Sequence, residues 1–424
     1  MSEVPVIQIL DKKNYFKQAL VAYPNALPLP PLAESSLRIR TEVISITTNN
    51  FCYCKLGDVF NWWSVHPIPP DTPAPYSDAA TYGRINAWGY ARVLESTFAA
   101  VPTGSYVWGY LPIGTLPLDF RVAPGAVPGQ FLVTEPYRQQ LLPVYNRYTF
   151  FPAPSAAALA DRIAAKDDGV AYDALVKVMH LTAYLMDRFM YPADSARSVS
   201  LRPEQADLSN ATVVVFAPGS KVGLAFAHLL RQRQKGAGKP RRVVGAASEA
   251  SLPFVRGTGV YDTVVSTTAA DPLTTLADLD STNADVNAES KDKKVVIYDF
   301  GGRAGVAWKW AAAIGAKYPR TRYVAVGIEV SDPTTAGDAA QQPAKPDGLE
   351  VDQVNADGML TAAVGQVGEK EFFEGFEKSW SGFREEGIKG FQIRWGEGIE
   401  SVKEGWDRFA RNEVTAAEGL VFKL

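Results

Sequence analysis

The chain has 424 residues, with 43 Lys and Arg against 46 Asp and Glu, which gives a formal net charge of −3. This balance argues against a nucleic-acid or anionic-membrane partner, since both attract strongly basic proteins. Hydrophobic residues make up 46% and charged residues 21%, as in folded proteins, and the length suits about two to three domains. Two Cys and three scattered His leave too few close ligands for a zinc site, so no metal is expected.

The compartment is expected to be the cytoplasm. The first residues, MSEVPVIQILDKKNYF, lack a basic segment followed by an apolar one, so they do not resemble a secretory signal. No run of about 18 apolar residues predicts a membrane-spanning helix. Cys52 and Cys54 are too close for a disulfide framework, and in a strand both thiols would face the same side. They are interpreted either as reduced thiols in a wall or core, or as a redox or soft-metal pair.

The first 150 residues predict a β domain, because they are rich in Pro, aromatic and β-branched residues and show almost no helical periodicity. Residues 37–46 alternate apolar and polar side chains, which predicts a half-buried strand. Further strands are predicted at 90–95 and 106–110, with the turn V-P-T-G-S at 101–105 between them.

After Pro154 the pattern changes to strands that alternate with helices. Helical spacing predicts helices at 156–163, 172–190, 224–233 and 304–317. Short apolar runs predict buried strands at 212–216, 242–247, 263–265, 294–299 and 322–327. This alternation predicts an α/β fold with a doubly wound parallel sheet. Residues 280–294 and 331–350 are polar and are expected to form loops.

The last part of the chain carries aromatic residues at helical spacing, from Phe372 to Trp395. Acidic residues balance the basic ones there, so a nucleic-acid platform is not favoured. We therefore expect three parts. A β-rich catalytic or substrate domain spans 1–190, a nucleotide-binding domain spans 191–350, and an aromatic, helical extension spans 351–424 and packs back on the first domain.

The loop after the strand at 212–216 is a candidate phosphate-binding turn, because a strand, a glycine-containing turn and a helix favour a pyrophosphate. The loop reads A-P-G-S-K-V-G. Gly223 takes the third position of a G-x-G-x-x-G pattern, Ser220 takes the second, and Gly219 supplies extra flexibility. Ser220 could bind a phosphate and Lys221 could neutralise one. Alternatively, the loop only maintains the fold and binds nothing.

The segment after the second strand bears on which dinucleotide would bind, because NAD sites usually carry Asp or Glu there. Ser248 and Ser251, with Lys221 or Arg242 nearby, could hold a 2′-phosphate, whereas Glu249 favours NAD. We predict NADP (as NADPH) as the cofactor.

The order of these motifs resembles the medium-chain dehydrogenase/reductase superfamily over roughly residues 35–330. The resemblance rests on G-Y-A-R-V-L-E at 89–95 followed by V-P-T-G-S-Y-V-W-G-Y at 101–110, on H-L-T-A-Y at 180–184, and on Y-V-A-V-G at 323–327. It implies a GroES-like β-rich catalytic domain followed by a Rossmann-type sheet. With F-V-x-x-x-G-x-Y-D at 254–262, the chain is similar to a divergent branch in fungi and bacteria, some of whose fungal members are expected in secondary-metabolite pathways.

Within this superfamily the chain resembles the zinc-free quinone and enoyl reductases. Asn49 and Asn50 stand where zinc alcohol dehydrogenases have a ligating Cys, and Tyr82-Gly83-Arg84 lies near their G-H-E. A zinc-free reductase needs a proton donor near the developing negative charge. Tyr53 is one candidate, with aromatic packing as the alternative.

Other side chains are candidates for supporting roles. Asn49 or Asn50 could bind an enolate or the nicotinamide ribose, or only cap a loop. His180 could be an acid or a core residue, and Thr182 touches the nicotinamide by analogy with the family. Trp62, Trp63, Trp88 and Tyr82 could wall a substrate pocket or pack the core. Asp299 and Arg303 could reach the cofactor or form an ion pair.

The leading hypothesis is a zinc-independent NADP-dependent oxidoreductase that reduces a carbonyl or an activated double bond in a small hydrophobic metabolite, for example one of the polyketide type. A second hypothesis keeps the cleft for a non-redox cyclisation, aldol-type or dehydration step. A third is a non-catalytic binding or scaffold protein. A homodimer through the sheet edge is possible, although the loop after Gly327 could block that edge.

Overall fold

The computed structural model describes residues 4–27, 29–234, 236, 238–268, 271–275, 293–327, 329 and 348–424. These residues fall into two compact units. The first unit comprises 4–178 and 392–424, and the second comprises the described residues of 179–329 and 348–391. The predicted loops at 280–294 and 331–350 lie almost wholly outside the described residues.

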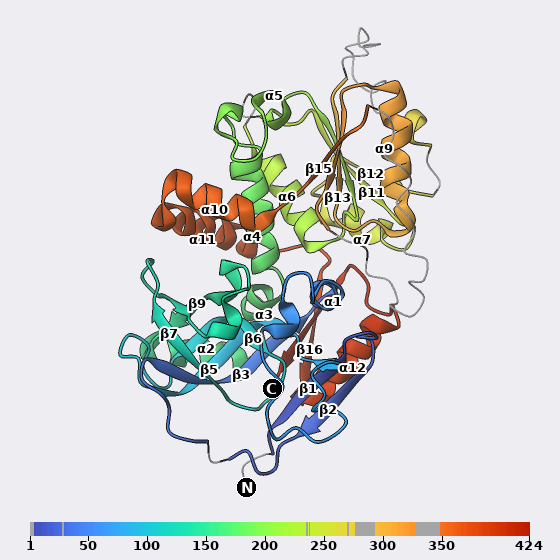
Figure 1. The fold of residues 1–424 in the computed structure, drawn as a ribbon. Coiled ribbons are helices and arrows are strands. Elements are labelled where there is room, and N and C mark those ends of the chain that lie inside the picture. The colour runs from blue at the N-terminus through green and yellow to red at the C-terminus, as the bar shows by residue number, and fades with distance from the viewer. Residues whose placement is uncertain are drawn as a thin grey trace. The chain divides into compact units, whose positions relative to one another are not determined.

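The first unit is built around a sheet of eight strands in the order β16-β17-β3-β5-β6-β9-β8-β7 (Figure 1). The strands are β3 (Ser36–Ile46), β5 (Asn86–Ser96), β6 (Tyr106–Pro112), β7 (Leu118–Pro124), β8 (Gln130–Val133), β9 (Arg147–Phe151), β16 (Gln392–Glu397) and β17 (Glu418–Lys423). The first residues of β3 also pair with β7, so six strands close into a barrel, and the rest of β3 pairs with β17. Closure removes free strand edges.

Strands β5 and β6 divide their side chains between two faces, because successive residues of a strand point to opposite sides. Ala91, Val93, Val107 and Leu111 belong to the barrel core with Phe120, Phe131 and Tyr148. Trp88 pairs with Tyr110, and Tyr90 pairs with Trp108, on the other face. This second face therefore carries a dense aromatic surface.

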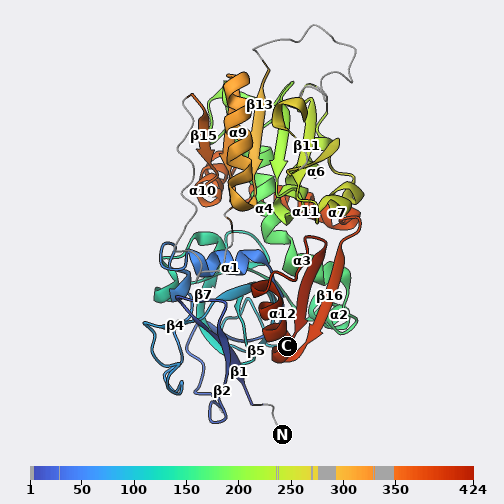
Figure 2. The ribbon, with the colours of Figure 1, turned by 90° about the vertical axis from the view of Figure 1, so that its right-hand side faces the viewer.

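The rest of the first unit comprises a small sheet and four helices. The sheet has the order β2-β1-β4, with β1 (Val6–Asp11), β2 (Gln18–Ala22) and β4 (Tyr82–Gly83). The helices are α1 (Thr48–Lys55), α2 (Ala153–Ala164), α3 (Asp168–Leu175) and α12 (Gly398–Ala410). Helix α12 lies beside β1 and β2 in Figure 2, and the Trp406 indole donates a hydrogen bond to the Tyr15 carbonyl at 3.0 Å.

The second unit contains a six-stranded parallel sheet in the order β12-β11-β10-β13-β14-β15. Its strands are β10 (Thr212–Phe216), β11 (Arg242–Ala247), β12 (Thr263–Ser266), β13 (Val295–Asp299), β14 (Thr321–Ala325) and β15 (Glu350–Gln353). Numbered from β10, this is the 3-2-1-4-5-6 order of dinucleotide-binding sheets. The strand order reverses between β10 and β13, where such sheets bind ligands at the carboxyl ends of their strands.

Helices cover both faces of this sheet. Helix α9 (Val306–Lys317) packs on the face that carries Val214, Phe216 and Ile297. Helix α6 (Lys221–Gln232) lies on the opposite face, where the Phe226 ring is 5.0 Å from that of Tyr298 (Figure 1). The remaining helices are α4 (Lys177–Leu185), α5 (Pro203–Ala206), α7 (Leu252–Thr258), α10 (Ala356–Val367) and α11 (Glu369–Glu386). The predicted fold class, a GroES-like β-rich domain with a Rossmann-type sheet, is confirmed.

Three local predictions are wrong. The Cys52–Cys54 segment lies in helix α1 rather than in a strand. The predicted helix 172–190 is broken at Val176 into α3 and α4, and it ends in a π-helical turn at Met186–Met190. The aromatic helix of the tail ends at Glu386, and Trp395 lies in strand β16.

The part of the chain treated as one extension, 351–424, is divided in the structure. Residues 351–391 belong to the second unit and 392–424 to the first. Strand β15 was not predicted, because Glu350–Gln353 is a short, largely exposed edge strand without an apolar run. None of the helices within the described ranges is both long and apolar enough to cross a bilayer.

Gly89 of β5 is a position where the fold tolerates no side chain. A Cβ there would lie 1.9 Å from the Val43 carbonyl oxygen of the neighbouring strand, and backbone cannot yield as a flexible side chain does. We expect Gly89→Ala to lower the free energy of unfolding by about 3 kcal/mol or more. Urea titration measures this change. In Gly257→Ala on helix α7 the new Cβ meets nothing within 4 Å, so stability should stay equal or rise. Equal effects of the two substitutions would contradict this account.

Candidate active site

The turn between β10 and α6 has the geometry of a phosphate-binding loop. The Ser220 hydroxyl caps α6 by accepting a hydrogen bond from the Gly223 N–H at 3.2 Å. A Cβ on Gly223 would lie 2.9 Å from the Ser220 Oγ and 3.3 Å from the Phe300 ring, so glycine permits the close approach of the helix to the sheet. The left-handed residue of the turn is Ala217, at φ +52°, and not Gly219.

Tyr261 holds this loop through a hydrogen bond, and nothing in the sequence marks it as a site residue. Its buried hydroxyl donates a hydrogen bond to the Pro218 carbonyl at 2.7 Å. Gly245 of β11 leaves the space, since a Cβ there would come within 3.1 Å of Tyr261 and 3.2 Å of Pro218. The tyrosine of the motif at 254–262 is therefore a structural support of the loop.

Lys221, at the first turn of α6, has no counter-charge among the described residues. Its Nζ lies 5.3 Å from the centroid of the Phe391 ring, and it pairs with no carboxylate among the described residues. Burial of the ammonium lowers the pKa of Lys221 to about 8. Because the N-terminus of a helix also favours negative charge, an anion at this position would restore the charged form.

Not all of the residues proposed for the 2′-phosphate lie at the same end of β11. Ser248 donates a hydrogen bond to the Ser251 hydroxyl at 3.1 Å, and both follow the carboxyl end of the strand. Glu249 accepts hydrogen bonds from the hydroxyls of Ser266 and Thr268, next to β12. Arg242 starts β11, roughly 20 Å of strand away from Ser248, so the expectation that it lies nearby is wrong.

Asp299, at the end of β13, accepts hydrogen bonds from the turn that follows it and from the neighbouring strand. Its carboxylate accepts hydrogen bonds from the N–H groups of Gly301 and Gly302, at 2.9 and 2.6 Å, and from the Tyr323 hydroxyl at 2.6 Å. These bonds hold the turn that faces the loop of β10 across the point where the strand order reverses.

His180 is a core residue of the second unit by its contacts. The imidazole is 0% exposed, and its Nε2 lies 2.9 Å from the Ser379 hydroxyl of α11. The rings of Phe376, Trp380 and Phe383 surround it at 5.0 to 6.2 Å. Burial lowers the pKa of His180 to about 3, so it is neutral at physiological pH. Thr182, on the same helix, is half-buried.

The buried, neutral state of His180 predicts a pH-dependent stability. The unfolded chain protonates His180 below about pH 6.5 whereas the folded chain does not, so the free energy of unfolding falls as pH drops from about 6.5 toward 3. We expect His180→Gln to remove a few kcal/mol of this dependence, at about 1.4 kcal/mol per pKa unit. Urea titrations between pH 4 and 7 measure it. An unchanged slope in the variant would contradict the assignment.

In the first unit, Tyr53 forms the centre of a hydrogen-bond network. Its hydroxyl oxygen accepts hydrogen bonds from the Asn49 amide at 2.6 Å and from the Trp88 indole at 3.0 Å. Asn49 and Tyr53 are one turn apart on α1, which brings their side chains together. Burial raises the pKa of Tyr53 well above its ordinary value, against the opposing hydrogen bonds from Trp88, Tyr145 and Asn49. The phenol is therefore protonated at neutral pH, with donors placed to stabilise its anion.

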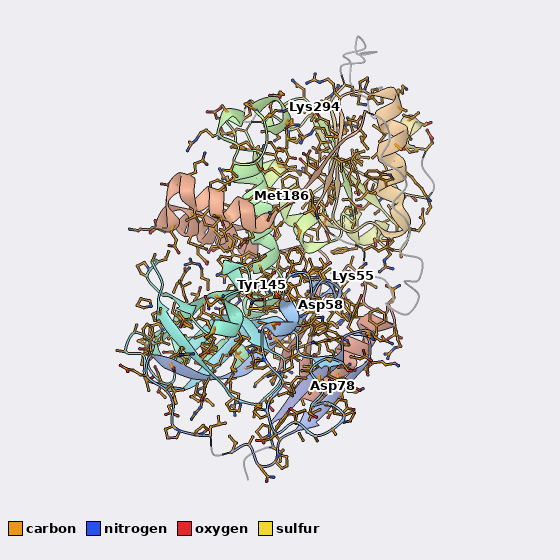
Figure 3. All side chains as sticks on the ribbon, in the orientation of Figure 1. Lys55, Asp58, Asp78, Tyr145, Met186 and Lys294 are labelled. Carbon is orange, nitrogen blue, oxygen red and sulfur yellow. The ribbon has the colours of Figure 1, made fainter. Side chains whose placement is uncertain are left out.

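Aromatic rings surround this hydroxyl. The Tyr53 ring lies 4.7 Å from that of Trp62, 5.2 Å from Tyr110 and 5.8 Å from Tyr145, which Figure 3 labels. Trp88 packs on Tyr110 at 5.4 Å. We call these five residues, Tyr53, Trp62, Trp88, Tyr110 and Tyr145, the aromatic cluster. Tyr110 could have been anticipated from strand alternation opposite Trp88, whereas nothing in the sequence marks Tyr145.

The other proposed pocket residues lie elsewhere in the unit. Asn50 is structural, since its side chain accepts from the Thr47 N–H at 2.8 Å and donates to the Asn86 carbonyl at 2.9 Å. Trp63 packs against Gly57 and Gly83. Tyr82 contacts Tyr76 at 5.2 Å beside the small sheet. The structure thus joins Asn49, Tyr53, Trp62 and Trp88, and leaves Trp63 and Tyr82 outside the cluster.

Both thiols of the cysteine pair are held in environments that disfavour the thiolate form. Burial raises the pKa of the Cys52 thiol to about 12 and that of Cys54 well above its usual value, so thiolates are disfavoured. Across the described ranges, no three His, Cys, Asp or Glu side chains are grouped to hold a metal ion.

Comparison with known proteins shows which family model matches the chain and which solved structures are similar to it. A family model described as "Protein of unknown function (DUF2855)" matches residues 44–415. No curated protein matches the sequence significantly. Among solved structures, the chain is similar to CurA in complex with NADPH from Vibrio vulnificus, with 14% identity, a TM-score of 0.54, and coverage of 99% of this chain and 98% of that one.

Two further structures align over 100% of both chains. A putative NADPH:quinone reductase from Bacillus thuringiensis is 13% identical with a TM-score of 0.52. A mutant form of enoyl thioester reductase from Candida tropicalis is 10% identical with a TM-score of 0.55. At these identities the similarity shows the fold, and it confirms the medium-chain dehydrogenase/reductase fold that the sequence motifs resemble.

Proposed function

We propose that this chain, which belongs to the DUF2855 family of proteins of unknown function, is an NADPH-dependent, zinc-independent reductase. Its substrate is a carbonyl or an activated C=C bond in a small hydrophobic metabolite, of the polyketide or another secondary type. The observation that carries the proposal is Lys221, a cation without a carboxylate partner among the described residues, at the first turn of the helix that follows the central strand of a 3-2-1-4-5-6 sheet.

In this proposal the second unit binds the cofactor. Gly219, Ser220 and Gly223 form the turn for the pyrophosphate, and Lys221 neutralises phosphate charge. Ser248 receives the 2′-phosphate, since Glu249 is engaged by Ser266 and Thr268. Thr182 touches the nicotinamide, by analogy with the medium-chain dehydrogenase/reductase superfamily. NADPH supplies a hydride when bound.

The first unit supplies the proton. Tyr53 is the general acid, because its phenol is protonated at neutral pH and two donors already point at its oxygen. When the proton leaves, the Asn49 amide and the Trp88 indole stabilise the phenolate. Asn49 is more exposed than Tyr53, so the substrate meets the network from that side. We do not assign an acid role to His180, because its contacts make it a core residue.

The reductase names of the similar structures support this class of reaction, and two of the names include NADPH. The experiment is a titration of the protein with NADPH and NADH, followed by tryptophan fluorescence, and then NADPH oxidation with a panel of quinones, enones and enoyl thioesters. We expect micromolar NADPH binding and turnover of at least one conjugated substrate. If neither dinucleotide binds at millimolar concentration, the proposal is wrong, and the non-redox enzyme and the non-catalytic binding protein are left as hypotheses. The cytoplasmic location and the homodimer stay predictions.

A further inference from the structure

Two buried arginines in the first unit lack the counter-charge that burial normally requires. Arg84 is 5% exposed and Arg138 is 0% exposed. The other buried arginines are paired, Arg38 with Glu95 and Asp119, and Arg322 with Asp352. Neither Arg84 nor Arg138 pairs with a carboxylate among the described residues. Burial lowers the pKa of Arg84 to about 10, and only the phenols of Tyr23 and Tyr137 oppose this shift.

His66 brings these arginines into one neighbourhood. It is 1% exposed, and its ring lies 6.4 Å from that of the tyrosine directly before Arg138. The charges of Arg138 and Arg84 act in the same direction as burial and lower its pKa. The Asn86 side-chain amide donates to the His66 Nε2 at 3.1 Å and to the Tyr110 carbonyl at 2.9 Å. Since Nε2 accepts, the single proton of the neutral imidazole is on Nδ1, which is buried and has no partner among the described residues.

Unused hydrogen-bond donors therefore collect around His66. The Arg138 Nε donates to Asn146 at 3.0 Å and its Nη2 to the Tyr145 carbonyl at 2.6 Å, but its buried Nη1 has no partner among the described residues. The Arg84 guanidinium makes no hydrogen bond to a described residue, although none of its nitrogens is among the fully buried atoms without a partner. A buried set of donors with excess positive charge is unfavourable unless an anion joins it.

We propose that this basic cluster of His66, Arg84 and Arg138 binds the carboxylate of the substrate. The two oxygens of a carboxylate accept about four hydrogen bonds, which matches the guanidinium forks and the imidazole N–H.

Strand β5 carries one residue that contacts His66 of the basic cluster and another that contacts the proton donor Tyr53. Asn86, which holds His66, and Trp88, which donates to Tyr53, share one face of the strand two residues apart, about 7 Å. The residues that hold His66 and Tyr53 are therefore neighbours on the same face of one strand. This inference rests on the proposed function for the reaction, and it narrows the substrate to a carboxylic acid.

The test uses binding alone, so that it does not depend on turnover. Calorimetric titration with benzoate is compared with titration with the uncharged benzamide and with inorganic phosphate, for wild type, Arg84→Met and Arg92→Met. Arg92 is an exposed arginine of β5 and serves as the matched control. We expect benzoate to bind in preference to benzamide and phosphate, with at least tenfold weaker binding to Arg84→Met and no change for Arg92→Met.

The thermal stability of Arg84→Met is a second measurement, and it should not fall when the affinity for benzoate does. Because Arg84 makes no hydrogen bond to a described residue, Arg84→Met should unfold at the same or a higher temperature than wild type without ligand. Lower thermal stability, equal benzoate affinity of Arg84→Met, or a preference for phosphate or benzamide would each overturn the assignment. Arg84→Gln repeats the test if the Met variant does not fold. Retained benzoate binding without NADPH turnover would overturn only the reductase function.

Discussion

Tyr53→Phe is expected to reduce the turnover of NADPH oxidation about 100- to 1000-fold, the range in which a positioned general acid contributes. The substitution removes one oxygen and keeps the ring that packs on Trp62 and Tyr110. NADPH affinity should be unchanged, because the loop around Lys221 belongs to the other unit. Steady-state kinetics with the best substrate of the panel, together with an NADPH titration, measures both quantities.

Tyr110→Phe is the matched control for this prediction. Its ring lies 5.2 Å from that of Tyr53, but its buried hydroxyl has no hydrogen-bond partner among the described residues. We expect near-normal turnover and unchanged or slightly higher stability, since removal of an unsatisfied polar group costs little. Trp88→Phe, which removes one donor to Tyr53, should lower turnover about tenfold with KM nearly constant. A normal rate for Tyr53→Phe would show that Tyr53 only packs the core.

Lys221→Glu is expected to weaken NADPH binding about 100-fold and NADH binding less, because the substitution replaces a neutralising charge with a repelling one beside phosphate. With the pKa of Lys221 near 8, wild-type affinity should also fall as pH rises through 8, when the ammonium loses its proton. Lys221→Arg stays charged and should keep its affinity across this range. Fluorescence titrations from pH 6.5 to 9.5 measure these changes.

Lys309→Glu is the matched control, since Lys309 is an exposed lysine on α9, on the opposite face of the same sheet. It changes the net charge equally but should leave both affinities within about twofold, because salt screens charges more than about 10 Å away. Equal losses of NADPH and NADH in Lys221→Glu would refute a role at the 2′-phosphate and assign Lys221 to the pyrophosphate. Unchanged NADPH binding would contradict any phosphate contact.

Part of the candidate site could be predicted because its signals are local in sequence. The capping of α6 by Ser220 and the close approach at Gly223 follow from one strand–turn–helix segment. The pairing of Asn49 with Tyr53 depends on the helix α1, because a helix brings residues four apart together. The sequence could not decide between the two interpretations of His180, because the residues that surround it in the fold are far away along the chain. They are Ser379, 199 positions away, and the aromatic residues of α11.

The sequence by itself determined the doubly wound sheet, because continuous apolar runs such as 212–216 can be buried only between two layers of helices. It also determined the scarcity of metal ligands, which is a matter of composition. Tertiary structure alone decided which polar groups go unpaired. Arg84, His66 and Arg138 come from separate segments, and nothing in their local sequence shows that all three are buried or that neither arginine pairs with a carboxylate among the described residues. Burial and counter-charge depend on which residues the folded chain brings together, so the local sequence does not show them. The sequence alone indicates that zinc ligands are scarce, and the structure shows that the candidate sites consist of amides, phenols and guanidinium groups instead.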